Sequence, residues 1–475
     1  MPAIGLFGTL DMGARALAAQ QAGIQVTGHN LANVNNTAYA RQRLNLQTSL
    51  PVAGPGGWEG TGLDAGSVVQ IRNSFLDAQM VSEASAQGSL ETQQSALQQL
   101  QSDLGQTLAG ASDPSSASTS TPTPGGLAGG LTDLFNAFQS LSTDPSSLGQ
   151  RSVLLMKASG LASQFNQVDQ YVGQLSGSLD QSVSTNVDQA NQLLSDIASL
   201  NGRIAQAETS APGSANDVRD LRQQKLEELG KLVKVDVGQD GDNSLTISVS
   251  GSELVSGSKV LDTLGTYASG NETLLVQTAG SNQPLTLTGG QIEGAITVRD
   301  GEVAALRKQI NSLASQLITQ VNAIHRSGFG LEGSTGADFF TGTNAADIGV
   351  NADLADNPDL VQASGVKGAV GDNQVALALG RLANQTIPAL QNQTLSQNYA
   401  TSVTGVGQSL ATVTTQVSDQ QAVQTMLSQQ RDSVSGVSLD EEMTNLTAYQ
   451  RAFEASAKLI TTVDEMLTTI VNMKT

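Results

Sequence analysis

Apolar residues recur every seven positions near both ends of this chain. The N-terminal row is Leu10, Leu17, Ile24 and Leu31, and the C-terminal row is Leu439, Leu446, Phe453, Ile460 and Leu467, with Met443 four residues after its first member. A seven-residue repeat places its members along one side of an α-helix. The pattern therefore predicts helices over residues 4–34 and 439–473, each with an apolar stripe.

Both predicted helices have boundary signals. Asn33, Asn35 and Asn36 follow the first helix, and asparagine tolerates the left-handed backbone that often ends helices. Ser438 and Glu441 have the spacing of a capping box at the start of the second helix. Glycines lower the helix propensity of the first helix by about 1 kcal/mol each, so we expect it to be ordered only by packing against a partner.

The pattern changes period between the two ends. Helical segments rich in Gln and Ser are separated by breaks rich in Ser, Pro and Gly. Apolar and polar residues alternate, as they do in strands, over residues 233–237, 245–250, 273–278 and 285–288. The sequence predicts one continuous helix over 146–178 and another over 180–209. The expected fold is mainly α with a small β insertion, in which the terminal helices pair as an antiparallel coiled coil.

The predicted domains follow from these segments. They are a terminal coiled-coil assembly domain (1–40 and 438–475), a helical bundle (73–232, 301–326 and 372–436), a β domain (233–298), an irregular segment with short strands (327–371) and a flexible Ser/Thr/Pro loop (111–126).

Composition and charge exclude several classes of partner and site. The 475 residues carry a net charge of −20, which argues against nucleic acid and anionic membranes as partners. Without cysteine the chain has no disulfide and no Cys-based zinc site. Its two histidines lack the neighbouring ligands of a metal site, and we expect no cofactor and no catalytic residue.

The first twenty residues do not resemble a cleaved signal peptide. They lack a basic region, and Asp11 and Arg15 interrupt their apolar residues. The chain contains no run of eighteen apolar residues, so no membrane span is expected. We expect the protein either to stay in the cytoplasm or to leave by a route that needs no cleaved signal.

From the residues alone, two interpretations of the ends stay open. The heptad rows are either the core of a domain or a surface for assembly with other subunits. The polar residues near the end of the first helix also have two interpretations. They form an ordinary helix end with a packed tyrosine, or they make contacts within the terminal hairpin or between subunits. These residues are Asn30, Asn33, Tyr39 and Arg41.

The two ends resemble the flagellar axial protein family, which comprises rod, hook and hook-associated proteins. The similarity lies in "NLAN" at 30–33 followed by "AYARQ" at 38–42, and in the closing segment "SGVSLDEEMTNLTAYQRAFEASAKLI" at 435–460. The central segments "STDPSSLGQRSVLL", "SLNGRIAQAE" and "VNAIHRSGFGLEGSTGADFF" are similar to hook-associated members, in the same order. Two positions depart from the family pattern, since Ala38 replaces the usual Gly and Gln223 replaces a frequent Asp.

The resemblance implies a structural protein that is not an enzyme and that works at the hook–filament junction. It implies export by the flagellar type III route and assembly with other copies, with the hook protein and with a second junction protein (hook-associated protein 3), aided by an export chaperone. In that arrangement the terminal helices line an inner tube and the β domain faces outward. A hook, rod or flagellin-like protein is the alternative, and flagellin is disfavoured because its terminal motifs differ.

Overall fold

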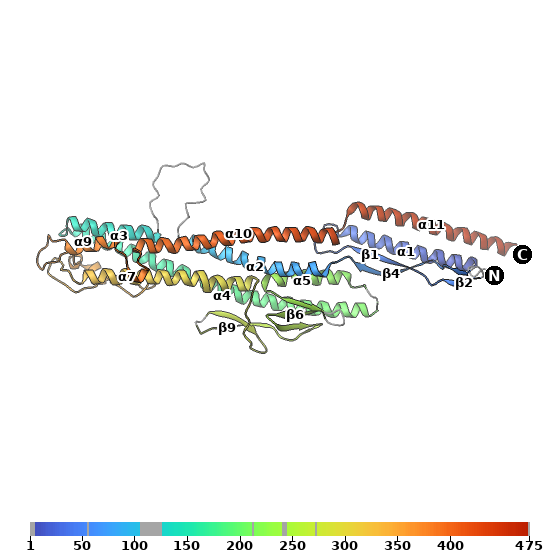
Figure 1. The fold of residues 1–475 in the computed structure, drawn as a ribbon, viewed down its shortest axis with the longest axis horizontal. Helices are drawn as coiled ribbons and strands as arrows, with labels where there is room; N and C mark the ends of the chain where they lie inside the picture. Colours follow the sequence, from blue (N-terminus) through green and yellow to red (C-terminus); the bar gives the residue numbers. More distant parts are fainter. Residues whose placement is uncertain are drawn as a thin grey trace.

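The computed structural model describes residues 5–54, 57–104, 126–210, 213–239, 245–270 and 273–473. The protein is a long rod (Figure 1). Both termini lie at one end of the rod, and irregular loops close the other. Of the predicted loop 111–126, all but the last residue lies outside the described residues.

The two predicted terminal helices are confirmed as α1 (Leu6–Ala32) and α11 (Leu439–Asn472). They pack antiparallel, because Gly13 lies against Ile460 while Gly23 lies against Tyr449. The predicted capping box is wrong: the Ser438 side chain makes no capping hydrogen bond. Three acidic residues in the first turn of α11 instead complement the positive end of the helix dipole.

A β-arm follows α1 and runs beside it (Figure 1). Its strands are β1 (Gln42–Thr48), β2 (Val52–Gly54), β3 (Gly57–Glu59) and β4 (Leu63–Gln70). Antiparallel pairing joins β1 to β4 and β2 to β3, with an irregularity between Leu44 and Leu46. The arm therefore returns the chain to the place where α1 ends.

Long helices form the rod's bundle. They are α2 (Ser74–Asp103), α3 (Gly126–Thr143), α4 (Leu148–Ser210), α5 (Asn216–Leu232), α7 (Ala304–His325) and α10 (Leu395–Ser435). The predicted break near residue 179 is wrong, because α4 is one helix of 63 residues. Leu175, Leu179, Val183 and Val187 are all buried at four-residue spacing, so the apolar row continues through that position.

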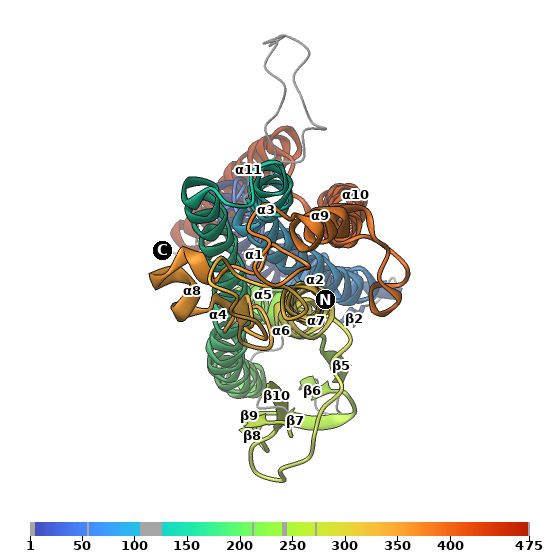
Figure 2. The ribbon, with the colours of Figure 1, turned by 90° about the vertical axis from the view of Figure 1, so that its left-hand side faces the viewer.

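The β insertion lies on one side of the helices, as the view along the rod shows (Figure 2). Strands β5 (Asp236–Gln239), β6 (Leu245–Val249), β7 (Ser252–Ser256) and β8 (Lys259–Val260) form an antiparallel sheet in that order. A second pair consists of β9 (Leu264–Ala268) and β10 (Leu274–Thr278).

The predicted β region extends too far towards the C-terminus. Residues 285–288 form no strand, and α6 (Gln291–Val298) continues through a π-helical turn at Arg299–Val303 into α7. The sequence LTLT alternates like a strand, but only Leu285 bonds to β10, donating its backbone N–H to Val276. Alternation over four residues is therefore a weak strand signal.

The closed end of the rod contains α8 (Ala352–Asp356), α9 (Gln374–Arg381) and three short 3-10 turns at Pro358–Leu360, Leu382–Asn384 and Pro388–Leu390. Short strands β11 (Phe340–Thr341) and β12 (Gly349–Val350) pair there, as predicted for 327–371. The buried His325 at the end of α7 accepts the Gln362 backbone N–H at 2.9 Å through Nε2, and its Nδ1 lies 2.8 Å from the Ala337 carbonyl oxygen. His325 is therefore a neutral ring with the proton on Nδ1.

We expect acid to loosen this end of the rod through His325. Burial lowers its pKa to about 4 from the ordinary value of 6.5. Between pH 6.5 and 4 the unfolded chain therefore binds a proton at His325 that the native state does not bind. The free energy of unfolding falls by about 3 kcal/mol over this range. Urea unfolding between pH 7.5 and 4.5 measures the loss. The His325→Asn variant, which cannot titrate, should show a shallower decline; equal declines would contradict the assignment.

The hydrophobic core excludes the terminal helices. Among the described residues, the large core cluster runs through the bundle, the β insertion and the closed end, and a small one joins α2 to α10. Neither cluster includes a residue of α1 or α11. No helix in the described ranges has the length and apolar character needed to cross a membrane.

Candidate functional site: the terminal helix pair and its junction with the rod

Small residues of α1 form the closest contacts with α11. Gly13 and Gly23 are buried, and a Cβ atom at Gly23 would lie 2.7 Å from the ring of Tyr449. Only a residue without a side chain allows this approach, since real Cβ atoms keep a greater distance. The glycines thus allow the two helices to approach closely, and the larger side chains of α11 fill the space beside them.

The predicted apolar rows flank this seam. The partly buried members are Leu10, Leu17, Ile24, Leu31, Leu446, Phe453, Ile460 and Leu467. Leu439 and Met443 are exposed at the start of α11. The only large apolar side chain of α11 that is fully buried is Val463, which the heptad row did not include. The pair therefore covers only part of its apolar surface.

Part of the remaining apolar surface lies on one side of α11. Leu459, Met466, Ile470 and Met473 are all exposed, and their spacing of seven, four and three residues places them on one helix face. We call these four residues the terminal apolar face. An exposed contiguous apolar face at the end of a rod is typical of a protein interaction surface.

Asn30 connects three separate segments at the other end of α1. Its side-chain oxygen accepts hydrogen bonds from the Tyr39 hydroxyl (2.8 Å) and the Gln42 backbone N–H (2.9 Å). Its amide nitrogen donates to the Gln42 carbonyl (2.8 Å) and to Glu442 (3.1 Å). These four contacts fill the capacity of an asparagine side chain, so Asn30 fixes the junction of α1, β1 and α11.

Arg41 ties the N-terminal motif to the start of α11. Its guanidinium pairs with Glu442 at 2.8 Å and with Glu441 at 2.6 Å, and its backbone N–H donates to the Ser435 carbonyl at 2.8 Å. Glu442 is only 2% exposed. A buried carboxylate needs such partners because desolvation otherwise disfavours its charge.

Asn33 and Tyr39 complete the end of α1. Asn33 lies at the helix C-cap and its side chain donates to the His29 carbonyl at 3.0 Å. The pKa of Tyr39 is raised far above its ordinary value, first by burial and then by nearby carboxylates, Asp217 foremost. Its hydroxyl therefore stays protonated and can donate to Asn30. Asn30, Tyr39 and Arg41 thus meet at one junction within the chain, and the Asn33 side chain bonds within its own helix beside it.

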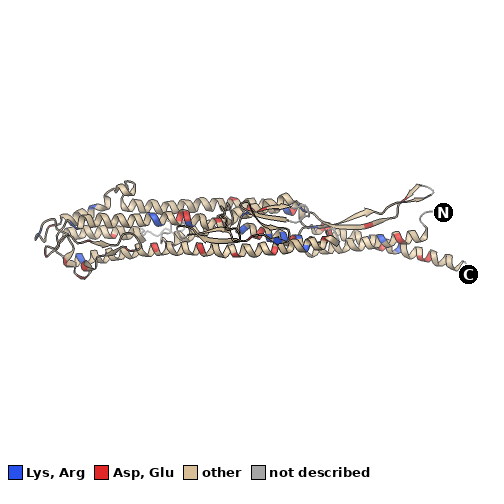
Figure 3. Cartoon of the chain, turned by 90° about the horizontal axis from the view of Figure 1, so that it is seen from below, with Lys and Arg blue, Asp and Glu red and all other residues tan. Residues whose placement is uncertain are grey.

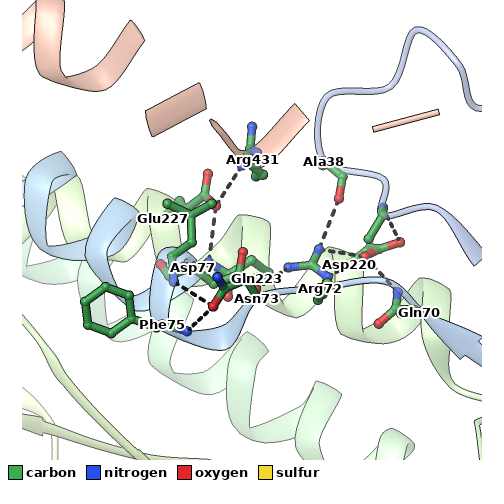
Figure 4. Close-up of polar contacts among 12 residues, drawn as sticks. Ala38, Gln70, Arg72, Asn73, Phe75, Asp77, Asp220, Gln223, Glu227 and Arg431 are labelled. Carbon is green, nitrogen blue, oxygen red and sulfur yellow. Dashed lines mark hydrogen bonds and ion pairs between the residues drawn. The ribbon is translucent and has the colours of Figure 1, made fainter. Parts of the chain in front are cut away.

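The sequence analysis missed the second half of the junction, in which Arg72 lies between two carboxylates of different helices (Figure 4). Arg72 pairs with Asp220 of α5 at 2.6 Å and with Asp77 of α2 at 3.0 Å. Asp220 also accepts from Gln70 and from the Ala40 backbone. Burial raises the pKa of the Asp220 carboxyl, and Arg72 offsets only part of that effect.

The two departures from the family pattern have local explanations. Ala38 does not have a positive φ, so the alanine adds no backbone strain, and its carbonyl accepts from Arg72. Gln223 donates to the Asp77 carbonyl and to Glu227. Beside the ion pairs of Arg72, Glu227 forms a further ion pair with Arg431 of α10 (Figure 4).

The junction holds elements together through ion pairs and hydrogen bonds. Within the described ranges, no group of three or more His, Cys, Asp or Glu is placed to hold a metal ion. Its carboxylates are neutralised by arginines or occupied by hydrogen bonds. What the arrangement does is fix the angle between the terminal helix pair and the rod.

Comparisons with known proteins indicate which class of protein this chain resembles. Residues 116–340 match the family described as "Flagellar hook-associated protein FlgK helical domain", and residues 428–473 match "Flagellar basal body rod FlgEFG protein C-terminal". Flagellar hook-associated protein 1 of Bacillus subtilis is 29% identical, covering 98% of this chain and 97% of that protein. The protein of the same name from Salmonella typhimurium is 25% identical, covering 96% and 98%.

A solved structure shares the fold. It is titled as the flagellar hook junction protein FlgK from Burkholderia pseudomallei, and its TM-score is 0.62 at 18% identity, over 75% of this chain and all of that one. The rod, the pairing of the two terminal helices and the matched segments together define a structural component of the bacterial flagellum, not an enzyme. Within that class, the chain is similar to flagellar hook-associated protein 1 over nearly its whole length.

Proposed function

We propose that this protein forms the junction between the flagellar hook and filament and is required for filament assembly. The names of its relatives motivate the proposal. The observation that carries it is the terminal apolar face, which lies on the helix pair outside the hydrophobic core. A helix pair that leaves such a face uncovered gains stability when neighbouring subunits bury it.

Copies of the chain form a ring or helical tube in this proposal. The terminal helices pack as a coiled coil at the inside, the bundle surrounds them and the β insertion faces outward. The assembly domain, 1–40 and 438–475, contains both heptad rows together with Asn30, Asn33 and Tyr39, and Arg41 directly follows its first segment.

The remaining partners follow from the same role. The hook protein lies below the ring, hook-associated protein 3 lies above it, and an export chaperone holds the terminal helices before export. The chain leaves the cell through the flagellar type III route without a cleaved signal and functions outside the cell. The absence of cysteine suits this route, because no disulfide restrains an unfolded chain.

Charging the terminal apolar face tests the proposal. Met466→Asp together with Ile470→Asp should reduce the fraction of hooks that carry filaments at least about tenfold, because each buried apolar side chain contributes about 1.5–3 kcal/mol. Electron microscopy of flagella measures the fraction. The matched control replaces two exposed polar residues of α11, Gln450→Asp with Thr461→Asp. Normal filaments in the Met466/Ile470 variant would refute the proposed role of this face.

A further inference from the structure

Two apolar features at the terminal end of the rod are open to solvent in the single chain. The first is the outer part of the β-arm, where Trp58, the only tryptophan of the chain, is 77% exposed. Leu50, also in the arm, is exposed as well. A tryptophan ring buries a large apolar area when it is covered, and for this reason tryptophan is a frequent anchor of protein–protein interfaces.

The second feature is a shallow groove between the start of α1 and the last turns of α11. Its volume is about 460 Å³, and it is lined by Leu6, Thr462, Glu465, Met466, Thr469 and Ile470. Two of these residues, Met466 and Ile470, belong to the terminal apolar face. Trp58 of the same chain does not line the groove, so the groove leaves room for an aromatic side chain from elsewhere.

The arm and α11 pack on neighbouring residues of α1. Met12 contacts the arm, since a Cβ atom at Gly62 would lie 2.9 Å from its side chain. Gly13, the next residue, contacts α11, since a Cβ atom there would lie 2.9 Å from Ile460. Gly62 and Ile460 are therefore at the same level along the rod, and α1 lies between the arm and α11 (Figures 1 and 3).

The arm and α11 both extend from this level towards the end of the rod where the termini lie (Figure 3). Trp58 is four residues beyond Gly62, which is about 13 Å in an extended chain. Met466 and Ile470 are six and ten residues beyond Ile460, which is about 9 and 15 Å along a helix. The exposed tryptophan and the groove therefore have matching heights in two copies that stand side by side.

We propose that Trp58 of one copy inserts into the groove between α1 and α11 of the neighbouring copy. The ring covers Met466 and Ile470, and the indole N–H donates to the carboxylate of Glu465. The contact is head-to-tail, because the arm and the groove are different surfaces, and its repetition without a shift along the rod closes a ring. The inference rests on the proposed assembly role and deepens it, since it names the surface that covers the terminal apolar face.

Cysteine crosslinking tests the contact in assembled flagella, because the chain has no cysteine of its own. One cysteine replaces Ala53, the strand partner of Trp58, and the other replaces Thr469 in the groove wall. A short bismaleimide should link the two positions between copies. Head-to-tail order should give products of two, three and more chains, whereas a symmetric contact would stop at two.

Thr468→Cys in place of Thr469→Cys is the matched control. Thr468 is exposed on the same helix, but it lies about 100° away around the helix axis. The yield of products with three or more chains should therefore fall about tenfold in the control. Equal yields from the two positions, or products that stop at two chains, would overturn the inference.

Substitution of the tryptophan itself separates assembly from folding. Trp58→Ser should lower the fraction of hooks that carry filaments at least about tenfold, as loss of an interface anchor does. Trp58→Phe keeps a ring without the N–H and should retain part of that fraction. The melting temperature of the purified Trp58→Ser protein should equal that of the wild type, because the side chain is exposed in the single chain.

A lower melting temperature of Trp58→Ser would show that the tryptophan acts within its own chain, and normal filaments on this variant would show that it has no role in assembly. Either result overturns the inference. Assembled flagella without the crosslinked series refute the Trp58 contact alone, whereas filaments on the Met466/Ile470 variant refute the assembly role.

Discussion

Removing residues 440–475 should leave cells with hooks but no filaments, and filament subunits should appear in the medium. The truncation deletes nearly all of α11 and with it Glu442, the buried partner of Asn30 and Arg41. It removes no residue of either core cluster, so the bundle should still fold. Electron microscopy of hooks and an immunoblot of the medium measure the result.

A sharper version keeps the chain at full length. Leu446→Asp with Phe453→Asp places two charges in the partly buried seam between α11 and α1, which should separate the pair and abolish filaments. The melting transition of the bundle should stay nearly unchanged, because the core lies elsewhere. Thr447→Asp with Glu454→Asp changes exposed neighbours on the same helix and is the control. Filaments of normal length in the Leu446/Phe453 variant would contradict the assembly role of the pair.

Replacing Arg72 with methionine should destabilise the protein more than any surface change. Arg72→Met leaves the carboxylates of Asp77 and Asp220 buried without their cation, and breaking such a pair typically costs about 3–5 kcal/mol. Chemical unfolding at pH 7.5 measures the loss. The exposed Arg43→Met is the matched control and should change stability by less than about 0.5 kcal/mol.

The pH dependence separates this mechanism from simple loss of packing. Burial already raises the pKa of Asp220, and loss of Arg72 should raise it further. A carboxyl whose native pKa exceeds its unfolded value stabilises the native state as pH falls, because the native state binds the extra proton. The deficit of the Arg72→Met variant should therefore shrink between pH 7.5 and 5. A deficit that does not change with pH would indicate that lost packing, not charge, causes it.

The sequence by itself determined the elements with strong and sustained periodicity. The heptad rows located α1 and α11, and the alternation at 233–237, 245–250 and 273–278 located β5, β6 and β10. It missed β7 and β9, because serine, glutamate, glycine or alanine interrupts the strand-forming residues of these five-residue runs. It also divided α4 between residues 178 and 180, whereas packing against the bundle keeps the helix continuous there.

Tertiary structure decided how the terminal motifs are used. The sequence identified Asn30, Asn33, Tyr39 and Arg41. Glu442, the partner of Asn30 and Arg41, lies 412 residues from Asn30 along the chain. Arg72 and Asp220 gave no local signal, since each matters only because folding brings β4, α2 and α5 together. Periodicity in the sequence shows which face of a helix is apolar. Only the fold decides which charged side chains are desolvated. Because a desolvated charge needs a partner, a few residues that are distant in sequence determine the junction.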